Sequence, residues 1–181
     1  ILAACALLSS CGKKKTVSMG NSSSNLSKAG KVCALGDSVY YVTNRHQIAE
    51  LGKGNTVVAE ADSPICELNQ TGDGRLAYLV MEPQGPSWIE VADLNKKTKE
   101  EIYRTSEDES ISYFCARESK LYVLCSTIDW DDRSRDYQWK QFDLADGSEK
   151  ELMSSDQFHV ENEWNSMEKQ KLTVVSSTCT E

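Results

Sequence analysis

The sequence lacks the motifs of the common catalytic and metal-binding classes. It has no Gly-x-Ser-x-Gly elbow for a hydrolase nucleophile and no Cys-x-x-Cys pair for zinc or redox chemistry. Its two histidines, His46 and His159, are far apart and neither has a metal partner at a ligand spacing. The glycines of Gly72-Asp73-Gly74 predict a hairpin turn rather than a phosphate loop. The sequence therefore identifies no catalytic residue.

The sequence also lacks a basic surface and a long apolar run. Its 20 Lys and Arg residues are outnumbered by 28 Asp and Glu residues, and the formal net charge is -8. An acidic domain repels phosphates, which argues against a nucleic acid partner. The first apolar run, Ile1–Leu8, is shorter than the roughly 20 residues of a membrane-spanning helix. Hydrophobic residues make up 39% of the chain, which is typical of a globular protein.

The first residues follow the pattern of a secretory signal. An uncharged apolar run leads to the small residues Ser9 and Ser10 and then to Cys11. No basic start precedes the run, so we expect residues 1–10 to be a signal peptide truncated at its beginning. Leu8-Ser9-Ser10-Cys11 resembles the lipobox of bacterial lipoproteins. The resemblance implies cleavage before Cys11 and a diacylglycerol attached to its thiol, with no other cofactor expected.

The residues after Cys11 suit a protein held at a membrane. Two acyl chains give stable anchoring, because each buried CH₂ contributes about 0.8 kcal/mol. Lys13, Lys14 and Lys15 add attraction to anionic lipid or simply form a solubilising flank. Residues 11–31 are rich in Gly, Ser, Asn and Lys and predict a flexible tether. We therefore expect the protein on the extracytoplasmic side of the cell membrane or envelope, with the membrane as a partner through the lipid.

Residues 32–181 carry a repeated pattern of β-strands. Cys33–Val42 aligns without gaps with Cys115–Leu124, and each segment predicts a strand, a polar turn and a second strand. Two of the hairpins are followed by a strand ending in Asp-Leu and then by a short charged strand, over 88–103 and 139–152. One repeat is therefore four strands. The second strand of each hairpin has an apolar anchor, and the anchors recur every 35–50 residues or so at Val39, Leu76, Leu121 and Leu172.

Four-stranded units at this spacing resemble the blades of β-propeller proteins. The resemblance implies an all-β domain of antiparallel blades, and a β-sandwich is the alternative. The chain offers two fairly complete blades, a short first one and the start of a fourth at Lys171. A ring closes with about 4–8 blades. We therefore expect residues 32–181 to be an incomplete propeller-like domain that is also truncated at its C-terminal end.

Five cysteines follow Cys11, and an odd number cannot all pair within the chain. They are Cys33, Cys66, Cys115, Cys125 and Cys179. The matching positions of Cys33 and Cys115 favour packing as small hydrophobic residues, with disulfide or metal roles left open. Trp88 and Trp139 begin corresponding third strands and are expected to pack between blades.

The loop around Trp130 is the best candidate for contact with a ligand. Its carboxylates Asp129, Asp131 and Asp132 are of the type that binds Ca²⁺, although the loop has neither the glycine nor the terminal glutamate of a helix–loop–helix calcium site. A solvated hairpin tip is the alternative. Trp130 has no counterpart in the other repeats, which makes it a candidate for recognition rather than for packing.

These features predict a membrane-anchored binding or scaffold protein whose ligand is a protein or a glycan. The second hypothesis is an extracytoplasmic glycan-active enzyme with its active site partly in further blades. The sequence does not assign Asp62, Glu67 or Asp73 to such a site. A structural lipoprotein without a dedicated ligand is the third.

Overall fold

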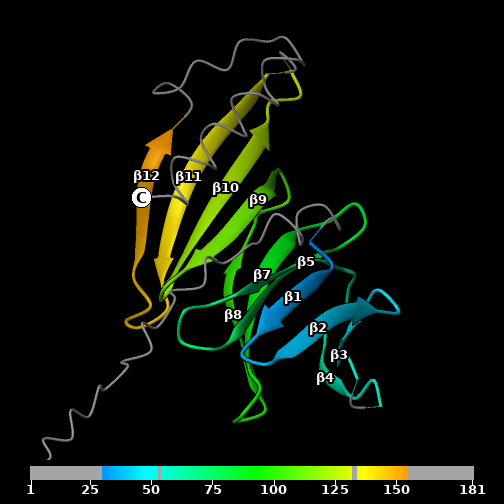
Figure 1. The fold of residues 1–181 in the computed structure, drawn as a ribbon. Coiled ribbons are helices and arrows are strands. Elements are labelled where there is room, and N and C mark those ends of the chain that lie inside the picture. Colours follow the sequence, from blue (N-terminus) through cyan, green and yellow to red (C-terminus); the bar gives the residue numbers. More distant parts are fainter. Residues whose placement is uncertain (1–29, 53, 132–133, 155–181) are drawn as a thin grey trace, which may run out of the picture.

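A computed structural model describes residues 30–52, 54–131 and 134–154, and every secondary-structure element in these ranges is a β-strand (Figure 1). In this part of the chain, no helix is long and apolar enough to cross a membrane. Several predictions concern residues outside the described ranges: the signal peptide, Cys11, most of the tether, Asp132, His159, the copy that begins at Lys171, and Cys179.

The strands form three four-stranded antiparallel sheets in which spatial order follows chain order. The first sheet contains β1 (Val32–Leu35), β2 (Ser38–Thr43), β3 (Gln47–Glu50) and β4 (Val57–Glu60). The second contains β5 (Ile65–Gln70), β6 (Leu76–Met81), β7 (Ser87–Asp93) and β8 (Thr98–Arg104). The third contains β9 (Glu109–Arg117), β10 (Lys120–Ile128), β11 (Arg135–Asp143) and β12 (Glu149–Ser154). Each sheet is thus one repeat of the sequence.

The second sheet is buried on both faces, and β6 shows why its sequence is a continuous apolar run. Leu76, Tyr78 and Val80 pack in a hydrophobic cluster with the first sheet. Ala77 and Leu79 point the other way and pack in a cluster with the third sheet. Successive side chains of a strand alternate between faces, so a strand covered on both sides needs apolar residues at every position. The three sheets therefore stack in chain order.

The strands within each sheet differ in exposure. The first strands of neighbouring sheets contact each other, β1 with β5 and β5 with β9. The fourth strand β8 is exposed over its charged first half, Thr98–Glu101. Charged side chains on an edge strand discourage pairing with other chains. In the second sheet, the first strand therefore lies close to the neighbouring sheets and the fourth strand lies at the surface.

The prediction of an all-β domain of four-stranded antiparallel units is confirmed, and the strands of the second sheet lie where the repeats placed them. In the third sheet, β9 and β11 begin earlier than predicted, at Glu109 and Arg135, because the long β10 pairs along nearly its full length with both of them. The first sheet is more complete than expected, because β3 and β4 were not predicted. Gly30 and Lys31, at the end of the predicted tether, already bond to the sheets: the carbonyl of Gly30 accepts from Leu68 N at 2.7 Å.

Trp88 and Trp139 are both buried, at 5% and 6% exposure, but they lie on opposite faces of their sheets. Trp88 packs towards the first sheet, whereas Trp139 belongs to a cluster on the far side of the third sheet. Counted back from the Asp-Leu pairs that end both strands, Trp88 corresponds to Gln138 rather than to Trp139. A shift of one residue moves a strand side chain to the other face, so the predicted equivalence of the two tryptophans is wrong.

Candidate functional site

Loops gather on one side of the three sheets, which we call the connector edge. It consists of hairpins 44–46, 82–86 and 129–134, of which 132–133 are not described, and of the sheet-to-sheet connectors 61–64 and 105–108. Backbone bonds join these loops: Ala61 N donates to His46 O at 2.9 Å, and Ile128 N donates to Asp108 O at 3.4 Å. The exposed acidic residues of this edge are Asp62, Glu82, Glu107, Asp108, Asp129 and Asp131.

Trp130 is the most exposed large hydrophobic side chain among the described residues, at 73%. It sits at the tip of the β10–β11 hairpin beside a hollow of about 570 Å³, which is also lined by Ile128, Ser134 and Arg135. The hairpin is held at its base, where Asp129 N donates to Ser134 O at 3.1 Å. An indole next to a guanidinium and a hydroxyl offers both apolar area and hydrogen-bond donors to a partner.

The carboxylates next to Trp130 do not form a metal site with other described residues. Oδ1 of Asp129 accepts a hydrogen bond from the backbone N–H of Asp131 at 2.9 Å, which makes a local turn. In the part of the chain that the structure describes, no group of three His, Cys, Asp or Glu side chains could hold a metal ion. The third predicted calcium ligand, Asp132, lies outside that part.

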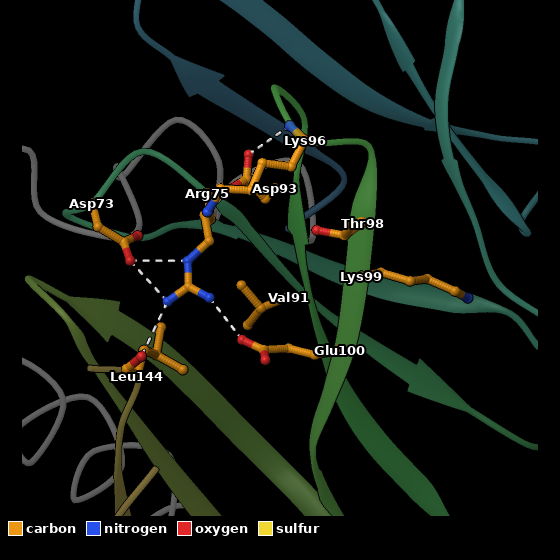
Figure 2. A pocket seen from close by; sticks show the side chains of 9 residues that line it. All are labelled: Asp73, Arg75, Val91, Asp93, Lys96, Thr98, Lys99, Glu100 and Leu144. Carbon is orange, nitrogen blue, oxygen red and sulfur yellow. Dashed lines mark hydrogen bonds and ion pairs between the residues drawn. The ribbon is translucent and has the colours of Figure 1, made fainter. Parts of the chain in front are cut away.

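A second hollow, of about 560 Å³, lies on the opposite edge of the sheets (Figure 2). It is lined mainly by the second sheet, and Leu144 of the third sheet completes it. Arg75 occupies its centre. The Arg75 guanidinium donates to Asp73 at 2.9 Å through Nε and to Glu100 at 2.7 Å through Nη1, and it reaches Leu144 O at 3.4 Å through Nη2. Sequence reasoning missed this hollow, because it combines three separate turns.

The charged side chains that line the Arg75 hollow already have hydrogen-bonding or ion-pair partners. Partial burial acts to raise the pKa of the Asp73 carboxyl, but hydrogen bonds from Arg75 and Thr71 outweigh it and hold that pKa below its usual value. Lys96 pairs with Asp93 at 3.0 Å (Figure 2). Lys99 points away from Arg75 and pairs with Glu90 at 3.0 Å. This arrangement links the second and third sheets and does not single out a ligand.

A buried polar network crosses the middle of the second sheet. Glu90 is 8% exposed and accepts hydrogen bonds from Tyr78 Oη at 2.7 Å, Trp88 Nε1 at 3.1 Å and Lys99 Nζ at 3.0 Å. Burial and the bond to Glu90 raise the pKa of Tyr78. Arg104 lies 4.0 Å from the ring centroid of Trp88. Each buried polar atom of this network has a partner, which is the pattern of a stabilising network rather than of an open site.

The remaining candidate residues are dispersed. Asp62 is exposed on the connector edge, Glu67 lies in β5, and Asp73 lies on the opposite edge, so the structure does not bring the three acids together. His46 is exposed on the connector edge, and His159 lies outside the described residues. No disulfide joins any two of the described cysteines, and Cys33, Cys115 and Cys125 are buried.

No protein-family model, curated protein or solved structure matches this chain. Among the described residues, the hairpin that carries Trp130 combines an exposed indole with a neighbouring hollow and is the best candidate for a recognition site.

Proposed function

We propose that this protein is a lipid-anchored, extracytoplasmic binding protein that recognises a protein or glycan partner through its connector edge. The observation that carries the proposal is Trp130, which is 73% exposed at the tip of a hairpin beside a hollow. Exposing an indole to water is unfavourable, and tryptophan and arginine are the residues most enriched where binding energy concentrates. Trp130 and Arg135 line the same hollow.

The rest of the edge supports a binding role. The hairpin of Trp130 rises from β10 and β11, two nine-residue strands that are paired along their full length. A rigid sheet that holds up a loop limits the conformational entropy lost on binding. The lipobox-like Leu8-Ser9-Ser10-Cys11 gives the reason to expect this work at a membrane surface, because a diacylglycerol on Cys11 would hold the domain there.

We further propose that the three sheets are consecutive blades of a β-propeller. Three features support this: each sheet is a four-stranded meander, the sheets stack in chain order, and their first strands are neighbours. A sandwich needs only two layers, whereas here the second sheet is covered on both faces by other sheets. Loops at the rim of such an assembly are where propellers place their binding residues.

The binding proposal is tested with the full-length lipoprotein and two matched variants. Trp130→Ala removes the exposed indole of the connector edge, and Leu51→Ala removes an exposed hydrophobic side chain, at 59%, from the opposite edge. Both should leave the thermal unfolding temperature unchanged. Screening against purified envelope proteins and a glycan array should find a ligand that binds wild type and Leu51→Ala equally and loses at least about tenfold in affinity for Trp130→Ala. Equal affinity for all three proteins would refute a role for Trp130.

A further inference from the structure

The outer face of the third sheet carries a hydrophobic cluster that differs from the other two. Its buried members are Leu124, Tyr137 and Trp139, with Tyr113, Tyr122 and Leu152 packed against them. All of these residues belong to β9–β12. By contrast, the other two clusters each combine side chains from two adjacent sheets. Among the described residues, no second sheet contributes to this cluster. It lies on the face away from the second sheet, because Leu121 and Val123 of β10 pack towards the second sheet and Leu124 points the other way.

The composition of this face is that of an interface rather than of a solvated surface. Trp139 is 6% exposed and Leu124 is 8% exposed. The rings of Tyr113 and Trp139 meet edge to face with centroids 6.3 Å apart. Aromatic residues bury the largest areas of any side chain, and a sheet face rich in them is stabilised by a second layer. The equivalent faces of the first and second sheets are each covered by the next sheet in the chain.

The second strand of each repeat shows which residues make such a cover. In β6, the anchor Leu76 and the alternate residues Tyr78 and Val80 pack towards the first sheet. In β10, the anchor Leu121 and the alternate residue Val123 pack towards the second sheet. In both strands, therefore, the anchor and every second residue after it pack on the preceding sheet. The residues between them face the other way.

The sequence contains a fourth copy of this strand pattern outside the described residues. Lys171-Leu172-Thr173-Val174-Val175 follows Lys120-Leu121-Tyr122-Val123-Leu124, with the same order of lysine, leucine, a variable residue, valine and an aliphatic residue. We propose that the outer face of the third sheet is the docking surface for this segment of the same chain. Leu172 and Val174 take the positions of Leu121 and Val123 and cover Tyr122, Leu124 and Trp139. The proposal concerns assembly of the domain and does not depend on ligand binding at Trp130.

The test is hydroxyl-radical footprinting of the whole 181-residue chain, read by mass spectrometry. Leu172→Asp and Val174→Asp should each raise the oxidation rates of Tyr122 and Trp139 several-fold, because a carboxylate cannot remain against an aromatic cluster. Thr173→Asp is the matched control, since its position faces away from the third sheet, and it should leave both rates unchanged. Tyr78, buried between the first and second sheets, reports whether the domain remains folded.

Three outcomes would overturn the proposal. The first is unchanged oxidation of Tyr122 and Trp139 in both aspartate variants. The second is an equal increase in Thr173→Asp. The third is a wild-type protein in which Tyr122 and Trp139 become more readily oxidised on dilution, while Leu172→Asp has no effect. A second copy of the chain would then cover this face. If an aspartate variant also exposes Tyr78, the milder variants Val174→Ala and Thr173→Ala replace it. Only Val174→Ala should then raise the oxidation rates of Tyr122 and Trp139. Equal rates in the two alanine variants would contradict the proposal.

Discussion

Tyr78→Phe should destabilise the protein by about 2 kcal/mol, because it deletes a buried hydrogen bond to a carboxylate. The Tyr78 side chain is fully buried, and its hydroxyl donates to Glu90 at 2.7 Å. A hydrogen bond to a charged group contributes roughly 1.5–3 kcal/mol. The lower part of that range applies here, since Glu90 keeps its bonds from Trp88 and Lys99 in the variant.

Urea unfolding followed by circular dichroism measures this effect. With a slope of about 1–3 kcal/mol/M, the loss corresponds to a midpoint lower by roughly 1 M. The control is Tyr122→Phe, which removes the hydroxyl of a half-buried tyrosine on the third sheet and should change the free energy of unfolding by less than about 0.5 kcal/mol. Glu90→Gln should cost more than Tyr78→Phe, because all three partners of Glu90 are donors and an amide nitrogen cannot accept from them.

The pH dependence provides an independent check. Burial and the bond to Glu90 raise the pKa of Tyr78, so above its usual value of about 10 the unfolded chain loses this proton while the folded chain keeps it. Stability should therefore fall as pH rises above about 10, and more steeply in the wild type than in Tyr78→Phe. If Tyr78→Phe and Tyr122→Phe have the same midpoint and the same alkaline slope, the reasoning about this network is refuted.

Three further predictions concern packing and buried thiols. Burial raises the pKa of the Cys33 and Cys125 thiols from 9.0 to about 12. The free energy of unfolding should therefore fall as pH rises between these values, and it should fall less in Cys33→Ala and in Cys125→Ala. Parallel curves for the wild type and the variants would argue against burial of the thiols. Gly72→Ala should cost about 1–3 kcal/mol in calorimetry, because its Cβ would lie 2.5 Å from the Cα of Glu118, and an unchanged transition would show that the contact is looser. Leu121→Ala, at a fully buried position between the second and third sheets, should lower the free energy of unfolding by about 2–5 kcal/mol in urea, and a loss below about 1 kcal/mol would contradict that placement.

The sequence was sufficient to place strands in the second and third sheets, because these strands are six to nine residues long and are separated by polar turns. It did not locate the starts of β9 and β11, which begin earlier than the repeats indicate. It was not sufficient for β3 and β4, which have four residues each. Strands this short give too few alternations to stand out from a loop. The pairing of β3 with β2 and of β4 with β3 depends on contacts between strands that a local pattern does not encode.

The faces of the strands were harder to predict than their positions. Trp139 was aligned with Trp88 by identity, but it lies one residue nearer the end of its strand, and one residue reverses the face. The Glu90 network illustrates the same point, because Tyr78 and Glu90 are partners only in the register of β6 and β7. Side chains that meet across strands become visible only once that register is known.

The candidate site was predictable only in part. Trp130 could be singled out because it interrupts a charged loop and has no counterpart in the other repeats. Its exposure and the hollow beside it required the hairpin geometry. The Arg75 hollow gave no signal, since its residues come from separate turns that the stacking of the second and third sheets brings together.

We propose that this domain works at a membrane surface, to which a diacylglycerol on Cys11 anchors it. Metabolic labelling of the full-length protein with a clickable palmitate analogue tests this anchor. We expect a labelled wild type and complete loss of label in Cys11→Ala, with Cys5→Ala as a control that keeps the label. A wild-type protein that takes up no label would refute the lipid anchor.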